Sequence, residues 1–434
     1  MEVSVKNFGT VLRADVHVGG LTVITGENDT GKSTIGKILF SLVKAISRYE
    51  EDLEEAKESR ITEISEKMYF NLRRFVNVED HNNLRELFHP RKMYAQLKSN
   101  AEKAIFERIN LIHHFMVTSD LPKALYESCL KNFEKISAII AEPDDEFNAI
   151  DRATKKAFFS EFKGEILPKP IKSSSRTQVS ITDGVSELID ISWGKDLAQS
   201  LKYIDDLGYS DATYVDSPSI IQFHNLVRNA RTHFDADSPG RGTVPLHVKD
   251  LAVKLEDSIY NFSLLDLFSV GESVSSKIAK IVGGQLVYDA EKSDFFLERN
   301  GFKLASSNIA SGIKSLGVID LLITSGAIKQ GALLILDEPE VNLHPKWQVD
   351  YCEIICELVK KEVDVIVNTH SPYIIEALKH FCDSSGIKNT FYLASKENQF
   401  GQSEFFDITE NISIAIDKLA APLQQLNKDD FFDF

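Results

Sequence analysis

The sequence is poor in cysteine and has no long apolar run. Its four cysteines, Cys129, Cys352, Cys356 and Cys382, are scattered, and the one close pair has no second pair to complete a zinc site. We therefore expect reduced thiols in the protein core. The longest apolar runs, such as Ala332–Leu336, are too short to span a bilayer, and the first residues lack the basic stretch and apolar core of a signal peptide. We expect a cytoplasmic protein with no membrane partner.

The sequence also lacks a surplus of basic charge. Its 49 Lys and Arg residues stand against 65 Asp and Glu residues, which gives a formal net charge of −16. A protein that coats nucleic acid needs clustered basic side chains to neutralise phosphates, so a broad nucleic-acid surface is not expected. A local basic groove stays open, and it would have to come from Lys169, Lys172 and Arg176, or from Arg228, Arg231 and Arg241.

The chain is long enough for one large core or two domains, and its composition is that of an ordinary globular protein. Residues 1–47 predict a strand at Glu2–Lys6, a second strand at Leu21–Thr25 and a helix that begins at Lys32. In that helix apolar residues recur with a 3.6-residue period and form one stripe. We interpret residues 1–47 as the first part of an α/β domain whose helix packs on a sheet.

Residues 48–210 are expected to form an inserted helical domain, because charged segments with helical spacing dominate its first part, for example Leu53–Met68 and Ile105–Val117. Two segments, 168–177 and 235–245, have the Pro, Gly and Ser content of exposed loops.

The α/β pattern returns in residues 211–378, with predicted strands at 285–288, 295–298, 333–336 and 363–368 and a helix at 311–324. This alternation predicts a largely parallel sheet. Residues 379–434 are expected to be a C-terminal extension with an acidic and aromatic tail at 427–434. That tail is a plausible docking peptide, or it packs on its own domain or frays.

A phosphate-binding loop is predicted between the strand at Leu21–Thr25 and the helix at Lys32. The run GENDTGKS, residues 26–33, fits the pattern GxxxxGK[ST] in the strand–loop–helix context that gives this pattern its meaning. Its glycines let successive N–H groups face a phosphate, Lys32 can reach the β- and γ-phosphates, and the Ser33 hydroxyl can bind Mg²⁺. The expected nucleotide contacts are Gly26, Asn28, Asp29, Thr30, Gly31, Lys32, Ser33 and Thr34.

Two further strand ends carry candidate catalytic side chains. The apolar strand at 333–336 ends in Asp337 and Glu338, which suits a carboxylate that holds Mg²⁺ through water and a carboxylate that polarises the attacking water. His370 follows the strand at 363–368, at the end of the strands where α/β sheets bind ligands, so it can reach a γ-phosphate.

The order GENDTGKS, SNIASGIKS (307–315), LLILDEPEVNLHP (333–345) and NTHSP (368–372) resembles the ABC-type ATPases of the SMC, RecF and OLD kind. The resemblance covers roughly residues 1–47 and 283–378. It implies an ATPase head with a largely parallel sheet flanked by helices, an antiparallel part, and ATP and Mg²⁺ as cofactors. It also implies a head-to-head dimer, or a higher oligomer built from dimers, in which two copies enclose the nucleotide.

The resemblance assigns further residues. Ser311 and Gly312 occupy the signature positions, where a hydroxyl and a helix N-terminus can face the γ-phosphate of the other copy. Lys314, two residues further on, either adds charge at the phosphate or faces solvent. Asn342 and His344 lie in the segment that resembles the dimer-contacting D-loop. Gln222 is the candidate for the glutamine that contacts the metal.

Nucleases that share this head carry a further metal-binding domain after the histidine motif, but only about sixty residues follow His370 here. We therefore expect an ATPase with no nuclease activity of its own. Free-standing heads of this build resemble the ATPase subunits of bacterial anti-phage systems such as Septu and PARIS, which assemble with a separate nuclease effector. The alternative is a DNA-repair or chromosome-maintenance ATPase that clamps duplex DNA.

Overall fold

Segments from both ends of the sequence build one sheet. The computed structural model describes residues 1–76, 80–119, 121–168, 176–232, 243–257, 271–396 and 401–429. Both loop segments expected from composition, 168–177 and 235–245, lie mostly outside these residues, as does the end of the tail beyond residue 429. The chain divides into a head unit, Met1–Ser47 with Ala153–Phe434, and a helical unit, Arg48–Arg152.

The described strands form one large sheet and one small one. Their bounds are β1 Glu2–Phe8, β2 Val11–His17, β3 Leu21–Gly26, β4 Thr177–Asp183, β5 Ser186–Trp193, β6 Gln199–Tyr203, β7 Ala212–Val215, β8 Gln285–Asp289, β9 Asp294–Arg299, β10 Phe302–Ala305, β11 Leu333–Asp337, β12 Asp364–Thr369, β13 Asn389–Ser395 and β14 Ser403–Asp407. The large sheet has the order β6-β5-β4-β1-β2-β14-β13-β3-β12-β11-β7, and β10-β9-β8 form the small antiparallel sheet.

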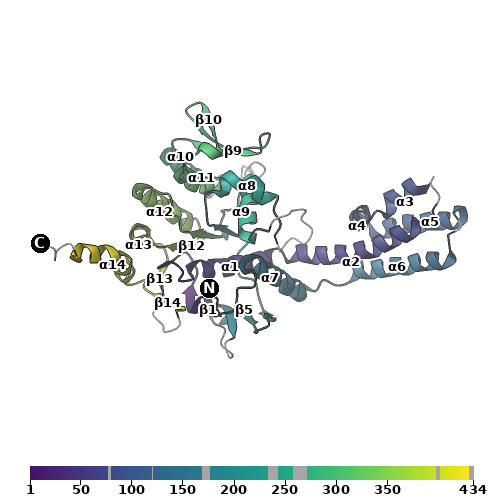
Figure 1. Ribbon diagram of the computed structural model, residues 1–434, viewed down its shortest axis with the longest axis horizontal. Helices are drawn as coiled ribbons and strands as arrows, with labels where there is room; N and C mark the ends of the chain where they lie inside the picture. Colours follow the sequence, from purple (N-terminus) through teal and green to yellow (C-terminus); the bar gives the residue numbers. More distant parts are fainter. Residues whose placement is uncertain are drawn as a thin grey trace. The chain divides into compact units, whose positions relative to one another are not determined.

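The large sheet is mixed. From β13 to β7 the neighbouring strands are parallel, and from β2 to β6 they are antiparallel. The α/β fold with a parallel part and an antiparallel part is thus confirmed. Figure 1 shows the N-terminal β1 near β13 and β14, and the pairing of β14 with β2 joins the two ends of the chain in this sheet.

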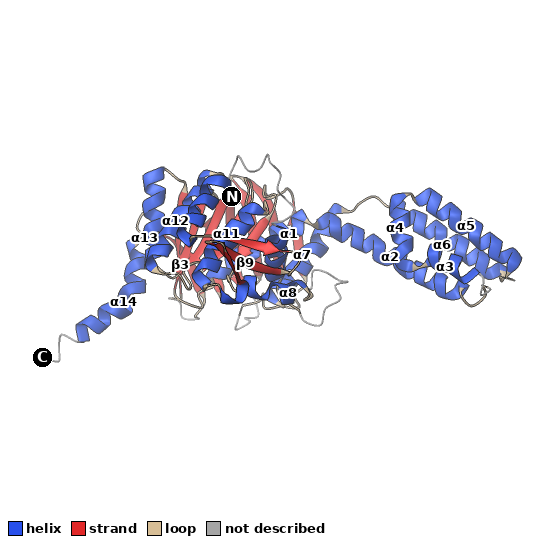
Figure 2. Cartoon of the chain, turned by 90° about the horizontal axis from the view of Figure 1, so that it is seen from above, coloured by secondary structure: helices blue, strands red, loops and turns tan. Residues whose placement is uncertain are grey.

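The described helices flank the large sheet in the head and make up the helical unit. Their bounds are α1 Lys32–Ser47, α2 Tyr49–Leu72, α3 His81–Phe88, α4 Pro90–Ser99, α5 Ala101–Thr118, α6 Lys123–Ala141, α7 Glu146–Phe162, α8 Ile220–Arg228, α9 Leu246–Glu256, α10 Gly271–Val282, α11 Ser311–Thr324, α12 Pro345–Lys360, α13 Pro372–Ser385 and α14 Ser413–Asp429. Figure 2 shows the helices of the head around its strands. None of the helices within the described ranges is both long and apolar enough to cross a membrane.

The expected domain boundaries need correction. The helical insert ends near residue 152 and not near 210, because β4, β5 and β6 extend the antiparallel part of the head sheet. In β4 alternate residues such as Val179 and Ile181 are buried, which is the period of two that a strand requires. Residues 379–434 are likewise not a mere extension, since β13 pairs with β3 in the parallel part of the sheet.

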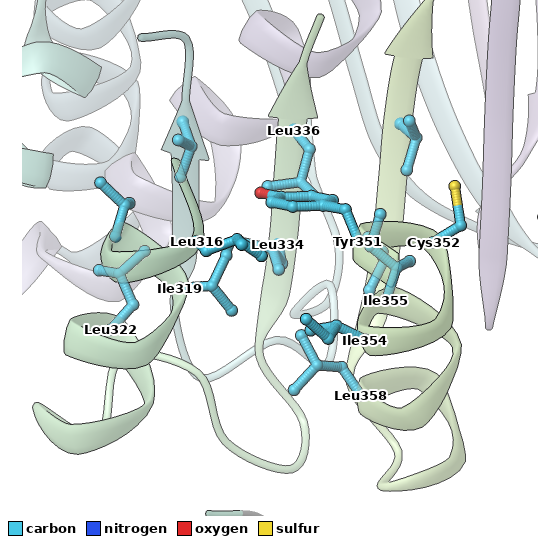
Figure 3. Close-up of a cluster of buried hydrophobic side chains, with 14 of the residues drawn as sticks. Leu316, Ile319, Leu322, Leu334, Leu336, Tyr351, Cys352, Ile354, Ile355 and Leu358 are labelled. Carbon is cyan, nitrogen blue, oxygen red and sulfur yellow. The ribbon is translucent and has the colours of Figure 1, made fainter. Parts of the chain in front are cut away.

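The largest hydrophobic core lies between the head sheet and its helices. Figure 3 shows α11 and α12 on either side of β11, with Leu316, Leu334, Leu336 and Ile355 among the side chains that meet there. Each of these four residues is at most 1% exposed. Full burial of such a side chain contributes about 1.5–3 kcal/mol. This packing therefore fixes the position of β11 and of the residues at its C-terminal end.

Helix α1 lies close to the other face of β11 because it carries a glycine there. A Cβ atom added at Gly36 would lie 2.8 Å from Cγ2 of Ile335. The same helix is anchored by the buried Lys44, whose Nζ lies 2.6 Å from both Asp211 Oδ1 and Asp250 Oδ1. These contacts position the N-terminus of α1 beside the C-terminal ends of β3, β11 and β12.

Candidate functional site

The predicted phosphate loop joins β3 to α1 and depends on its two glycines. Gly26 has φ 147° and Gly31 has φ 75°, a backbone region that L side chains rarely adopt. A Cβ atom at Gly26 would lie 2.4 Å from the Ala394 carbonyl oxygen, and one at Gly31 would lie 2.7 Å from Val11 Cγ2. Any larger residue would therefore push the loop away from β13 and β2.

Lys32 is buried at the start of α1 and folds back over the loop. Its ammonium donates hydrogen bonds to the carbonyl oxygens of Gly26, at 2.9 Å, and Glu27, at 2.7 Å. Burial lowers the pKa of Lys32, while the nearby carboxylates of Glu338 and Asp337 act in the opposite direction. The ammonium of Lys32 is buried at a helix N-terminus and donates its hydrogen bonds to carbonyl oxygens. An anion at this place would therefore be attracted both by the lysine charge and by the helix N-terminus.

Three side chains converge on the carboxylate of Asp337 at the end of β11. The hydroxyl of Ser33 donates to Asp337 Oδ1 at 3.0 Å, and so does the amide of Asn368, also at 3.0 Å. On the other oxygen, the Tyr214 hydroxyl donates to Asp337 Oδ2 at 2.7 Å. The expected metal pair of Ser33 and Asp337 is therefore in direct contact, and its oxygen donors are of the kind that Mg²⁺ prefers.

Tyr214 is part of this network although sequence reasoning did not select it. It lies on β7, next to β11 in the sheet, and its side chain is completely buried. Burial raises the pKa of Tyr214, and the carboxylate of Asp337 raises it further. The phenol therefore stays a neutral donor that holds Oδ2 of Asp337, whereas Oδ1 faces Ser33.

Glu338 and His370 also meet at this edge. Glu338 has φ 49°, a strained conformation for a residue with a side chain, and its N–H donates to the Asn368 carbonyl oxygen at 2.8 Å. Its Oε1 lies 3.5 Å from Nδ1 of His370, and both side chains are about 40% exposed, at 40% and 42%. The third side chain in this group is Glu340, whose Oε1 lies 3.3 Å from the same nitrogen.

The signature residues Ser311 and Gly312 begin helix α11. Ser311 is exposed, whereas Gly312 is buried against the D-loop, since a Cβ atom there would lie 3.2 Å from the Asn342 carbonyl oxygen and from the ring of Trp347. Asn342 has φ 66°, and the His344 ring accepts a hydrogen bond from the Lys346 N–H at the start of α12. The segment expected to be the signature motif thus packs against the segment that resembles the D-loop.

Gln222 lies in the first turn of α8, and the structure pairs it with the signature helix. Its Oε1 accepts a hydrogen bond from Nζ of Lys314 at 3.1 Å. The glutamine that was expected to contact the metal is therefore engaged with α11, because it belongs to a helix and not to the loop that follows β7. Lys314 is buried, which excludes one of the two alternatives left open for it, that it faces solvent.

Asp216, directly after β7, belongs to a second network that sequence reasoning missed, in which His247 and Glu161 are buried and Asp216 is 37% exposed. Nε2 of His247 lies 3.2 Å from Asp216 Oδ2, and Nδ1 of His247 lies 2.7 Å from Glu161 Oε2. Burial alone would lower the pKa of His247, but hydrogen bonds with Asp216 and Glu161 raise it to about 9. The His247 ring lies 4.8 Å from that of Tyr214, so this network supports the tyrosine that holds Asp337.

The four cysteines are free and buried, as expected from their spacing. Burial raises the pKa of the Cys129 thiol to about 11, which keeps it protonated. Cys352 lies in α12 and is 0% exposed. These thiols are part of the core and not of the site.

Comparisons with known proteins agree with the chemistry of this edge. A family model described as AAA ATPase domain matches residues 1–375. A protein of Mycoplasma pneumoniae named as an ABC transporter ATP-binding protein is 30% identical over 114 residues, which are 25% of this chain and 32% of that protein. The chain thus spans about a third of the length of this curated relative.

Solved structures of SMC heads show weaker likenesses. The SMC head domain from Thermotoga maritima is 13% identical, with a TM-score of 0.38 and coverage of 94% of this chain and 97% of that chain. A SmcHead bound to the C-winged helix domain of ScpA is 12% identical, with a TM-score of 0.44 and coverage of 95% and 98%. The Smc head of Pyrococcus furiosus with an extended coiled coil, bound to the C-terminal domain of ScpA, is 11% identical, with a TM-score of 0.41 and coverage of 98% of both chains. At these scores the likenesses say nothing about what this chain binds.

Proposed function

The chain belongs to the AAA ATPase domain family, and on this premise we propose that it binds Mg²⁺-ATP at the C-terminal edge of β3, β11 and β12 and hydrolyses it there. The observation that carries this proposal is the direct contact of Ser33 with Asp337 beside the buried ammonium of Lys32. These residues come from two segments about 300 positions apart in the sequence, and their meeting supplies the cation and the oxygen ligands that a triphosphate with its metal requires.

Each residue has a defined task in the proposed site. The loop N–H groups between Gly26 and Ser33 and the N-terminus of α1 hold the phosphates, and Lys32 exchanges its carbonyl partners for phosphate oxygens. Ser33 and Asp337 hold the metal ion, which supplies positive charge to the β- and γ-phosphates when it is bound. Tyr214 and Asn368 keep the Asp337 carboxylate in the orientation that serves this purpose.

Glu338 is the proposed general base, and His370 is the proposed contact to the γ-phosphate. Both side chains are partly exposed on the same edge of the sheet, so each can reach a ligand while its backbone is fixed by the strand that precedes it. A carboxylate beside a ring nitrogen is suited to orient and deprotonate an attacking water.

We further propose that two copies enclose the nucleotide, with Ser311 and Gly312 of one chain facing the phosphate loop of the other. In support of this arrangement, the Ser311 hydroxyl is exposed at the N-terminus of α11, while the glycine behind it is buried. A helix N-terminus with a free hydroxyl is a ready site for the γ-phosphate of a partner-bound ATP.

For the cellular role, we propose an ATPase subunit that assembles with and regulates a separate nuclease effector in bacterial anti-phage defence. The observation that favours a protein partner is in the helical unit, where Phe70, Phe106 and Val117 are 56%, 65% and 75% exposed. These exposed aromatic and aliphatic side chains are available to pack against another protein.

The alternative, a clamp on duplex DNA, depends on a basic stripe. Of the residues that would have to supply it, Lys169, Lys172 and Arg241 lie outside the described residues. Arg228 forms an ion pair with Glu256 at 2.9 Å, and Arg176 donates to the Ser192 hydroxyl. The charge of Arg228 is thus offset by an acid, whereas Arg176 donates to an uncharged hydroxyl and Arg231 is exposed. The effector role is preferred because the chain has a formal net charge of −16.

The test of the ATPase site compares Glu338→Gln and Lys32→Ala with Glu353→Gln. We expect Glu338→Gln to keep ATP bound and to lose at least about a hundredfold in kcat, and Lys32→Ala to lose nucleotide binding. Glu353 lies on α12 and pairs with Lys277 away from the loop, so its variant should behave like the parent. Normal turnover by Glu338→Gln would refute the assignment of the base.

The test of the cellular role is purification of the tagged protein from its native locus in the presence of ATP. Co-elution of a nuclease in a fixed ratio is the expected result. A lone ATPase that retains duplex DNA at physiological salt would instead favour the clamp. If a protein partner co-elutes, Phe106→Ser should weaken its binding.

A further inference from the structure

Glu340 is a buried acid beside the proposed catalytic pair. It lies two residues after Glu338 in the turn that follows β11, and its side chain is only 5% exposed. A buried carboxylate costs several kcal/mol unless hydrogen bonds compensate it, so its partners show what it does.

The partners of Glu340 all belong to the segment that carries His370. Its Oε1 accepts hydrogen bonds from the Thr369 hydroxyl at 2.7 Å and from the His370 N–H at 2.8 Å. The same oxygen lies 3.3 Å from Nδ1 of the His370 ring. One carboxylate oxygen therefore faces the main chain and the side chain of a single histidine.

The ring of His370 has two carboxylates near one nitrogen. Nδ1 lies 3.3 Å from Glu340 and 3.5 Å from Glu338. In the described part of the chain, this nitrogen and Oε2 of Glu340 are both buried atoms without a hydrogen-bond partner. Carboxylates only accept hydrogen bonds, so a ring proton on Nδ1 makes this nitrogen a donor toward the carboxylates beside it.

We propose that Glu340 is the positioning residue of His370. It fixes the histidine main chain through the N–H, and it selects the ring tautomer that carries a proton on Nδ1. The other ring nitrogen, Nε2, is then directed to the ligand, and the Glu338 carboxylate is left free to act on water. This inference rests on the proposed role of His370 in ATP hydrolysis.

The arrangement assigns distinct tasks to the two acids of the DEPE segment. Glu338 is 40% exposed and lies at the ligand side, whereas Glu340 is buried behind the histidine. Because Glu340 acts through another residue, its loss should lower turnover and leave the affinity for ATP nearly unchanged.

The test is a double-mutant cycle in the full chain, with kcat, KM for ATP and the thermal midpoint measured for each variant. We expect Glu340→Ala to lower kcat about 10- to 100-fold with KM within about twofold of the parent. Glu340→Gln keeps the side-chain volume and a neutral acceptor, so it should fold normally and lose about tenfold in kcat, because a charge-assisted hydrogen bond is roughly twice as strong as a neutral one.

The decisive comparison is made in the His370→Ala background. There Glu340→Gln and Glu340→Ala should change kcat by less than about twofold, because the group that Glu340 positions has been removed. Losses that multiply in the double variants would show a structural role of Glu340 and overturn the inference, and the Gln variant gives this answer even if Ala fails to fold.

The same cycle separates this inference from the function on which it rests. If His370→Ala lowers kcat while both Glu340 variants turn over like the parent, only the positioning role of Glu340 is refuted. If His370→Ala itself turns over like the parent, the proposed contact of His370 with the γ-phosphate fails, and the inference fails with it. The control Glu353→Ala should keep kcat and KM unchanged.

Discussion

The head unit contains ion pairs that are largely buried, whereas the ion pairs described in the helical unit lie at its surface. In the head, largely buried charged groups pair with one another, such as Lys44 with Asp211 and Asp250, and His247 with Glu161. In the helical unit the ion pairs lie on the surface, and both partners are about half exposed in the pairs Arg60–Glu142 and Lys98–Glu54.

The two units differ in their ion pairs because the head carries the proposed site and the helical unit does not. Surface ion pairs are screened by solvent and contribute little, so the helical unit depends on its apolar core, which includes Phe88, Phe115 and Phe133. Buried charge networks are costly to form and poor at adding stability, and we propose that those of the head serve to fix geometry. The head has such networks on the elements that carry the proposed site, α1 and β7, where geometry decides catalysis.

The largest effect is expected when the buried network of Lys44 is broken. Burial alone would lower the pKa of Lys44, but Asp250 and Asp211 raise it, so the lysine is charged and its loss leaves two carboxylates with Lys254 as their remaining cation. Lys44→Ala should destabilise the protein by about 3–5 kcal/mol, measured by urea unfolding.

A Lys44→Met variant sharpens this result, because it keeps most of the apolar stem while removing the charge. It should remain destabilised by more than half as much as Lys44→Ala, since the cost is dominated by two largely buried carboxylates left with one cation and not by the lost volume. Parent-like unfolding of Lys44→Met would show that the network contributes nothing to the head.

The second-largest effect is a pH dependence of the protein's stability that arises from His247. Its pKa is raised from 6.5 to about 9 in the folded protein. A group whose pKa is raised on folding contributes its full stabilisation below its unfolded pKa and loses it as the pH rises through the folded value. This contribution, on the order of 3 kcal/mol, is therefore present below about pH 6.5 and is lost by about pH 9 to 10.

The variant His247→Gln removes this titration while it keeps the ability to form hydrogen bonds. Urea unfolding at several pH values should show the largest difference from the parent below pH 6.5 and a progressively smaller one up to about pH 10. A difference that is the same at every pH would contradict the interpretation of His247 as a charged group held by Glu161 and Asp216.

Much of the site could be predicted because its motifs are contiguous and their geometry is local. The phosphate loop needs glycine at residues 26 and 31 for backbone reasons that hold in any sequence, and the structure gives both glycines positive φ. The strand that ends at Asp337 and the helix that begins at Ser311 were also predicted, since apolar runs and helical periodicity are read over neighbouring residues.

The rest depends on residues that meet only after folding. Tyr214 reaches Asp337 from a strand 123 positions away, and Glu161 reaches His247 from 86 positions away. No local pattern marks a buried tyrosine or a buried acid as part of a network, and acids after a strand are usually solvated. Glu340 was therefore taken only as part of the D-loop segment, although its burial against His370 gives it a task of its own.

The smallest effect on stability is expected from an ion pair on the surface of the helical unit. This pair tests whether exposed ion pairs contribute as little as the comparison of the two units implies. Lys98 donates two hydrogen bonds to Glu54, each at 2.7 Å, a geometry that would be strong in a protein interior. Because both side chains are 58% exposed, water and salt compete with the pair, and Lys98→Ala should leave the unfolding midpoint indistinguishable from that of the parent. If Lys98→Ala instead destabilised the protein as much as Lys44→Ala, exposure would not be what separates the ion pairs of the two units, and hydrogen-bond geometry would have to replace burial as the explanation.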